Sequence, residues 1–178
     1  LDYTFSDTIP INLSNYTWKD VEENLITIKA GIRYGEVHLK FPIRIDSNLG
    51  CVIGHIFGDG SIDKKFLRIS YYNSNIELLK EFVRCMSVIF DTKVLIYVEK
   101  DRSFNEKSEK YKVNSLNDIK GTNASLVYPK ICAVILCALF GEFAKGKKKK
   151  ITKEIRNSNL GFKKGLIKAF FDDDGSID

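Results

Sequence analysis

Two short segments of the sequence share one pattern of small and acidic residues. The first is VIGHIFGDG at Val52–Gly60, and the second is IKAFFDDDG at Ile167–Gly175. Ser-Ile follows the glycine in both, so Asp59 and Asp174 hold equivalent positions. A single Asp-Gly pair is usually only a turn. A repeat with the same spacing favours a shared role for the two carboxylates.

Two carboxylates held close together repel each other unless a cation lies between them, and Mg²⁺ or another divalent cation suits that position. Such a cation can lower the pKa of an attacking water and offset charge on a scissile phosphate. Asp59 and Asp174 are therefore candidate catalytic residues and metal ligands. The chemistry that they favour is hydrolysis of phosphodiester bonds.

Small residues precede each aspartate at helical spacing and predict how the two carboxylates meet. The aligned positions are Gly50, Gly54 and Gly58 in the first copy and Gly165, Ala169 and Asp173 in the second. A glycine inside a helix costs about 1 kcal/mol relative to alanine. Three in register favour close packing against another helix. We predict two parallel helices that bring the aspartates together, with Gly60 ending the first helix at a positive φ.

The segments around the first copy predict an α+β unit with the order αββαββα. Asp46 or Ser47 caps the first helix, and Asn75 lies before another. Alternation predicts a strand at 66–72. The other predicted elements are a hairpin at 93–98 and 111–116, a nearly apolar helix at 128–143 and the second-copy helix at 161–171.

The predicted organisation has three parts. Residues 1–46 form an extension of unknown role, with a short helix from Trp18 and strands at 26–28 and 36–41. This extension could be a helix-turn-helix, a β-rich cap or the tail of another domain. Residues 47–160 form the αββαββα domain with a basic linker, and 161–178 start a second copy.

Both repeated segments resemble the LAGLIDADG motif of homing endonucleases and of the endonuclease domains inside inteins. Val52–Gly60 matches the motif at its Gly, small-residue, Asp and Gly positions, and Ile167–Gly175 is similar. The Asn73-Ser74-Asn75 turn and the lysine-rich approach to the second copy also resemble the family. The resemblance covers 49–178 and implies one LAGLIDADG domain followed by the first helix of a second, pseudo-symmetric copy.

The resemblance also implies an antiparallel DNA-binding sheet and one metal-binding aspartate in each copy. By that match Asp59 and Asp174 are the catalytic metal ligands, with Mg²⁺ or another divalent cation as cofactor. The backbone carbonyls of Gly58 and Asp173 are implied to lie next to the metal. A lysine near the metal often assists the reaction in this family, and the sequence leaves open which lysine does so here.

Several residues depart from the motif. His55 and Phe57 replace a leucine and an aspartate, and Lys168 stands at a small apolar position. Asp173 also stands at a small-residue position. We expect His55 to be a packing or surface residue and Asp172 to cap the helix or pair locally.

Strand alternation predicts the surface that would contact double-stranded DNA. If Leu67, Ile69 and Tyr71 pack on the helices, the intervening side chains point outward. Arginine and polar residues on a two-stranded ribbon suit the major groove, and lysines suit phosphates. The predicted DNA-binding residues are Lys64, Lys65, Arg68, Ser70, Tyr72, Lys100, Arg102, Lys107, Lys110 and Lys112. The basic run at 145–150 either contacts phosphate or is a solvated loop.

Composition narrows the class of protein further. The chain has 178 residues, 44% of them hydrophobic, and a net charge of +5 that is concentrated after residue 48. We expect a protein that is not secreted and resides in the cytoplasm, the nucleoid or an organelle matrix, because no signal peptide or membrane span is apparent. The cysteines lack zinc-site spacing and are expected to be small buried hydrophobes in a reducing compartment.

The function that these features favour is site-specific cleavage of double-stranded DNA. The alternatives are a silent nucleic-acid binder of the same fold, such as an intron RNA maturase or a DNA-binding regulator, and an inactive fragment of a larger endonuclease or intein. The chain begins at Leu1, and the second copy stops at Asp178. We therefore expect that the rest of a second half-domain or a second chain completes the site.

Overall fold

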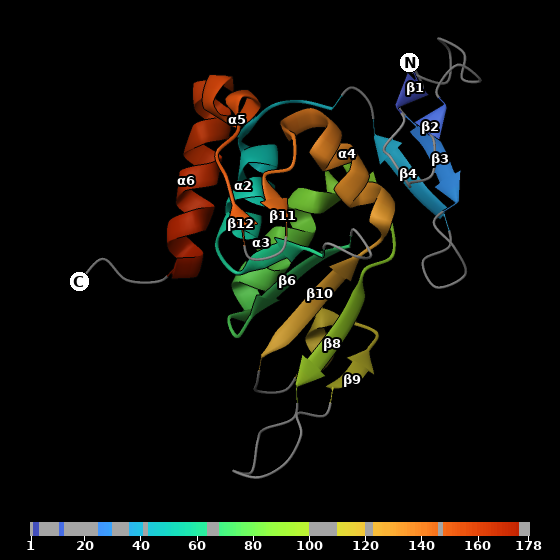
Figure 1. The fold of residues 1–178 in the computed structure, drawn as a ribbon. Helices are drawn as coiled ribbons and strands as arrows, with labels where there is room; N and C mark the ends of the chain where they lie inside the picture. Colours follow the sequence, from blue (N-terminus) through green and yellow to red (C-terminus); the bar gives the residue numbers. More distant parts are fainter. Residues whose placement is uncertain are drawn as a thin grey trace.

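The computed structural model describes residues 2–3, 11–12, 25–29, 36–40, 43–63, 68–99, 110–119, 123–145 and 148–174. The described helices are α2 (Ser47–Phe57), α3 (Ile76–Ser87), α4 (Lys130–Phe140), α5 (Lys153–Asn157) and α6 (Leu160–Asp174), with a 3₁₀ turn η1 at Leu116–Asp118. These helices combine with mainly antiparallel sheets (Figure 1), so the predicted α+β class is confirmed. None of the described helices has the length and apolar character needed to cross a membrane.

The largest described sheet has seven strands in the order β12-β11-β5-β6-β10-β8-β9. Its strands are β5 (Gly60–Ile62), β6 (Ile69–Asn73), β8 (Leu95–Glu99), β9 (Lys110–Val113), β10 (Ala124–Tyr128), β11 (Ala144–Lys145) and β12 (Lys148–Lys149). The pairings are antiparallel except between β11 and β5. Helices α2, α3 and α4 all contact β6, the second strand after the first motif.

Strand β6 follows the predicted alternation. Ile69 and Tyr71 are fully buried, whereas Arg68, Ser70 and Tyr72 are only partly buried. Leu67 lies outside the described residues. One face of the sheet therefore packs under the helices, and polar side chains occupy the other.

The sequence analysis missed β10, which lies between β6 and β8. The predicted hairpin exists as β8 and β9, but β10 pairs with the other edge of β8. The helix predicted from Tyr128 begins only at Lys130, after its N-cap Pro129. Tyr128 belongs to the strand, where Ala124, Leu126 and Tyr128 alternate toward the core. A five-residue strand that runs directly into an apolar helix gives too short an alternation to separate the two.

Local side-chain capping fixes the helix starts. Asp46 accepts hydrogen bonds from the backbone N–H of Asn48 and Leu49, and Asn75 accepts one from Glu77. Such caps satisfy N–H groups that have no partner within the helix. Both predicted cap positions are confirmed, with Asp46 rather than Ser47 as the first.

Part of the N-terminal extension is joined to the rest of the molecule by a sheet. Strands β3 (Leu25–Lys29) and β4 (Glu36–Lys40) form an antiparallel hairpin, and β4 pairs with β7 (Phe90–Asp91), which follows α3. A separate pair consists of β1 (Asp2–Tyr3) and β2 (Ile11–Asn12). The predicted strands are confirmed, while the helix predicted from Trp18 falls on residues outside those described.

Candidate acidic site at the seam of two helices

Helices α2 and α6 run parallel and pack against each other at backbone distance. A Cβ added to Gly50 would collide with the backbone carbonyl of Phe162, and one added to Gly54 would collide with that of Leu166. From the other side, a Cβ on Gly165 would collide with the backbone oxygen of Ser47. The glycines of both motif copies therefore lie in the seam. Their energetic cost as helix residues is offset by the approach that they allow.

Gly58 and Asp173 meet at the C-terminal end of the seam. They hold the same position in the two motif copies, and a Cβ on Gly58 would lie 2.5 Å from both Cβ and Oδ2 of Asp173. The missing side chain of Gly58 thus makes room for the carboxylate of Asp173, whose side chain is fully buried.

The buried carboxylate of Asp173 accepts hydrogen bonds from residues of α2 and β6. The Tyr71 hydroxyl donates to its Oδ1 at 2.6 Å, and His55 Nδ1 lies 3.0 Å from both oxygens. The backbone N–H of Asp59 points to Oδ2 at 3.5 Å. Burial, and then the hydrogen bond to Asp173, raises the pKa of Tyr71, which keeps that hydroxyl a donor. Asp173 therefore joins the two helices to the sheet through hydrogen bonds.

Asp59 lies beside this cluster, on the exposed end of the seam. Its Oδ2 accepts a hydrogen bond of 2.9 Å from Asn73 Nδ2, which lies 3.4 Å from Asp173 Oδ1. Desolvation, and then the negative charges of Asp173 and Asp174, raises the pKa of Asp59. Asp174, at the last position of α6, is exposed. At this end of the seam, the negative charges of the three carboxylates therefore exceed the positive charge of the neighbouring cation.

That cation is Lys149, supplied by the basic run at 145–150. In the described parts of this run, β11 and β12 pair with each other and β11 extends the sheet beside β5. Lys149 Nζ donates a hydrogen bond to the backbone carbonyl of Gly58, and its charge lowers the pKa of Asp59. The basic run therefore contributes a hairpin with a lysine at the end of the seam.

One expectation about the motif, that for Gly60, needs correction. Gly60 does not end α2 at a positive φ, since Gly141 alone among the described glycines has one. Gly60 instead begins β5, where a Cβ would lie 2.5 Å from Cα of Ile56. Of the two alternatives for His55, packing is confirmed: the residue is fully buried and its ring contacts Tyr71 and Phe82. Its contact with the Asp173 carboxylate was not predicted. Asp172 pairs locally with Lys168 at 2.6 Å, as predicted.

The outer face of the sheet carries the described part of the predicted DNA-binding surface. Ser125 of β10 aligns with Tyr72 of β6 and with Tyr97 of β8, and Tyr97 aligns with Lys112 of β9. Glu99 lies on this face as well. It accepts a hydrogen bond of 2.8 Å from the Tyr72 hydroxyl and pairs with Lys110 at 2.9 Å. Lys64, Lys65, Lys100, Arg102 and Lys107 lie outside the described residues.

The sequence analysis did not predict that three residues at the seam contribute to the site. Tyr71 and Asn73 were assigned to the core face of a strand and to a helix-capping turn, and Lys149 was one lysine in a basic run. The spacing of Tyr71 and Asn73, two residues apart on the buried face of β6, was the available signal. No family model matches the chain, and no curated protein matches it either.

Proposed function

We propose that this protein is a metal-dependent endonuclease of the LAGLIDADG type that hydrolyses phosphodiester bonds in double-stranded DNA. The observation that carries the proposal is the convergence of Asp59, Asp173 and Asp174 at one end of a parallel, glycine-lined helix seam. Desolvation, and then the charges of Asp173 and Asp174, raises the pKa of Asp59, and such disfavoured carboxylates cluster at functional sites.

The residues at the seam fit a divalent cation in part. Asp59 and Asp174 are exposed carboxylates, and the Gly58 carbonyl already attracts the ammonium group of Lys149. Oxygen donors of this kind suit Mg²⁺. The Asp173 carboxylate is committed to Tyr71 and His55, so we assign the metal to the carboxylates of Asp59 and Asp174 and to the backbone carbonyls of Gly58 and Asp173. When bound, the cation would polarise the scissile phosphate and acidify an attacking water.

The protein's own residues would orient the reacting groups. Asn73 holds one oxygen of Asp59, and Asp173 holds Asn73, Tyr71 and the Asp59 backbone in place. Lys149 is the lysine that we assign to the site. Its ammonium group binds the Gly58 carbonyl next to Asp59, from where it would stabilise negative charge on a cleaved phosphodiester without rearrangement.

The polar outer face of the sheet is the proposed surface for DNA. Arg68, Ser70, Tyr72 and Lys112 suit contacts with base edges and phosphates. Glu99 lies on the same surface, where it accepts a hydrogen bond from Tyr72 and pairs with Lys110. In the complex we expect phosphate to compete with Glu99 for Lys110.

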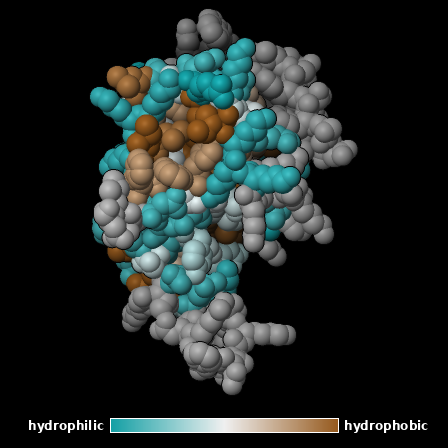
Figure 2. Space-filling model, turned by 60° about the vertical axis from the view of Figure 1, so that its left-hand side comes forward, coloured by the Kyte–Doolittle hydropathy of each residue, from teal (hydrophilic) through white to brown (hydrophobic). Residues whose placement is uncertain are grey.

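A second αββαββα unit would complete the site. Figure 2 brings the α6 side of the molecule forward and shows apolar surface there, framed by hydrophilic residues. Leu160, Ile167 and Phe171 of α6 are each more than half exposed. Helix α2 carries no such face, since the sheet and α3 cover it. The exposed face of α6 is therefore suited to packing against a sheet and a helix of a second unit, which this polypeptide or a second chain would supply.

The proposal is tested by incubating the protein with Mg²⁺ and a library of long random-sequence duplexes, then sequencing the newly formed ends. We expect ends at a shared target sequence, and Asp59→Asn or Asp174→Asn should lower the cleavage rate by on the order of 100-fold or more. Asp172→Asn is the matched control and should retain activity. If the protein selects a target from the library yet never nicks it, the silent nucleic-acid binder replaces the nuclease.

A further inference from the structure

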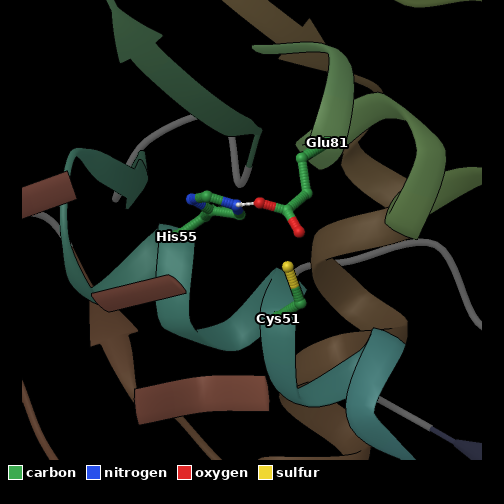
Figure 3. A group of neighbouring side chains, drawn as sticks. All are labelled: Cys51, His55 and Glu81. Atoms are coloured by element: carbon green, nitrogen blue, oxygen red, sulfur yellow. Dashed lines mark ion pairs between the residues drawn. The ribbon is translucent and has the colours of Figure 1, made fainter. Parts of the chain in front are cut away.

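Helix α2 presents a second group of chemically competent side chains on the side that faces α3. Cys51 and His55 lie one helical turn apart, and Glu81 reaches toward them from α3 (Figure 3). The Cys51 sulfur, a ring nitrogen of His55 and a carboxylate oxygen of Glu81 all lie within 4.8 Å of one another. Thiolate, imidazole and carboxylate are the three common side-chain ligands of zinc.

The hydrogen bonding of His55 leaves one nitrogen directed into this group. Nδ1 lies 3.0 Å from both oxygens of Asp173, and an ionised carboxylate can only accept, so Nδ1 carries the proton. Nε2 is buried and has no hydrogen-bond partner within the described part of the chain. It lies 3.8 Å from Glu81 Oε2. In a neutral imidazole the Nε2 lone pair would then face a carboxylate, an unfavourable arrangement without a cation between them.

The separation of 3.8 Å between Nε2 and Oε2 is too long for a hydrogen bond. It is close to the distance between two ligands of one metal ion. Tetrahedral zinc with bonds of about 2.1 Å to nitrogen and oxygen places those two atoms about 3.4 Å apart. Closing the difference requires a movement of a few tenths of an ångström by the partly exposed Glu81 side chain.

The contact between His55 and Asp173 matches the usual surroundings of a metal-bound histidine. A ligating imidazole commonly donates its other N–H to a carboxylate, which fixes the tautomer and raises the basicity of the ligand. Asp173 does this from α6, across the seam. The charges also agree, because a cysteine thiolate, a glutamate and a neutral histidine together neutralise a divalent cation.

Within this group, Glu81 is the residue that meets solvent. Glu81 is 24% exposed and lines a surface pocket of about 620 Å³, together with Lys168, Asp172 and residues of α3. Lys168 Nζ lies 3.3 Å from Oε1 and 3.2 Å from Oε2 of Glu81, and 2.6 Å from Asp172. If Oε2 turns toward a metal, Lys168 gives up that contact and keeps those with Oε1 and Asp172. Cys85 follows Glu81 by one turn of α3.

We propose that Cys51, His55 and Glu81 bind one Zn²⁺ ion or a similar borderline-soft divalent cation, separate from the oxygen-rich site of Asp59 and Asp174. The metal clamps α2 to α3. Through His55 it also holds Asp173, and hence the end of the helix seam, in its observed orientation. Sequence spacing gave no sign of this site, because its ligands come from two helices at 51, 55 and 81.

The test is a Co²⁺ titration of the chelator-treated full chain without DNA. Cobalt reports a thiolate ligand through a charge-transfer band in the near ultraviolet. We expect one equivalent to produce the band, Zn²⁺ to displace it, and Zn²⁺ to raise the melting temperature. Glu81→Gln, on a partly exposed side chain, should weaken Co²⁺ binding at least tenfold, and Asp173→Asn by roughly 10- to 100-fold.

Matched controls separate this site from the other cysteines and from the proposed nuclease centre. Cys51→Ser should abolish the band, whereas Cys137→Ser on α4 should leave it unchanged. Asp59→Asn should also leave it unchanged, so failure of the nuclease proposal and failure of this site are distinguishable. Absence of the band in the wild-type chain, or its persistence in Cys51→Ser, would overturn the inference.

Discussion

Helices α2 and α6 carry the same motif in very different surroundings. Every residue of α2 from Leu49 to Ile56 is buried, whereas the buried residues of α6 are Phe162, Gly165 and Ala169. The side of each helix that faces the other is alike, with small residues that let the backbones touch. The comparison shows that the repeated motif specifies the seam, while the environment beyond it depends on other parts of the fold.

The two copies also differ within the seam, at the position of Gly58 and Asp173. One copy carries the smallest side chain, and the other places a carboxylate into the space that this leaves. The pair is therefore asymmetric, and a buried acid replaces a simple small-to-small contact. Asp59 and Asp174, one residue later, remain exposed and equivalent.

The largest expected effect comes from removing that buried acid. Asp173→Ala leaves the Tyr71 hydroxyl and His55 Nδ1 buried without their acceptor, and each unsatisfied group costs about 1–3 kcal/mol. We expect the free energy of unfolding to fall by roughly 3 kcal/mol in urea denaturation. Asp172→Ala, which removes an exposed pair with Lys168, should change it by less than about 1 kcal/mol. Equal effects would contradict the asymmetry between these neighbouring acids.

A smaller loss is expected when the seam itself is widened. Gly50→Ala places a methyl group against the Phe162 carbonyl, and overpacking of this kind costs about 1–3 kcal/mol even though alanine favours the helix. Thermal or urea unfolding measures the change. Ile167→Ala, on the exposed side of α6, is the control and should cost less than about 0.5 kcal/mol. A stabilised Gly50→Ala variant would show that the helices do not touch as described.

Asp59→Asn should stabilise the protein in metal-free buffer while removing the proposed cleavage. Desolvation, and then the charges of Asp173 and Asp174, raises the pKa of Asp59, so its ionised form is disfavoured in the folded state and a neutral amide avoids both effects. Because Asp59 is exposed, we expect a gain of no more than about 1 kcal/mol. The gain should shrink as the pH falls and the wild-type carboxyl takes up a proton. A loss of stability at neutral pH would contradict these effects.

The smallest effect on folding is expected on the exposed face of α6. Replacing Ile167 and Phe171 together by serine should change the unfolding free energy by less than about 1 kcal/mol, because both side chains are more than half exposed. If this face binds a covering unit, the substitutions should reduce self-association in sedimentation experiments. Identical sedimentation of a self-associating wild type and this variant would exclude the face as an interface between copies of the chain.

The sequence alone determined two helix caps, the alternation along β6 and the helix seam. Asp46 and Asn75 could be identified as caps because a cap is a short-range hydrogen bond. The glycine spacing of the two copies indicated a close helix pair because a helix face without side chains lets another helix backbone approach closely. Alternation along β6 placed Ile69 and Tyr71 inside for the same local reason.

Only the tertiary structure decided which groups meet at the end of the seam. Tyr71 and Asn73 come from β6, Lys149 from β12 and Asp173 from α6. Their contacts depend on how these elements pack and pair, which the sequence does not encode locally. The buried group of Cys51, His55 and Glu81 likewise arises from the packing of α2 on α3. Spacing along a chain predicts neighbours within one element, whereas a site assembled from several elements depends on how they pack.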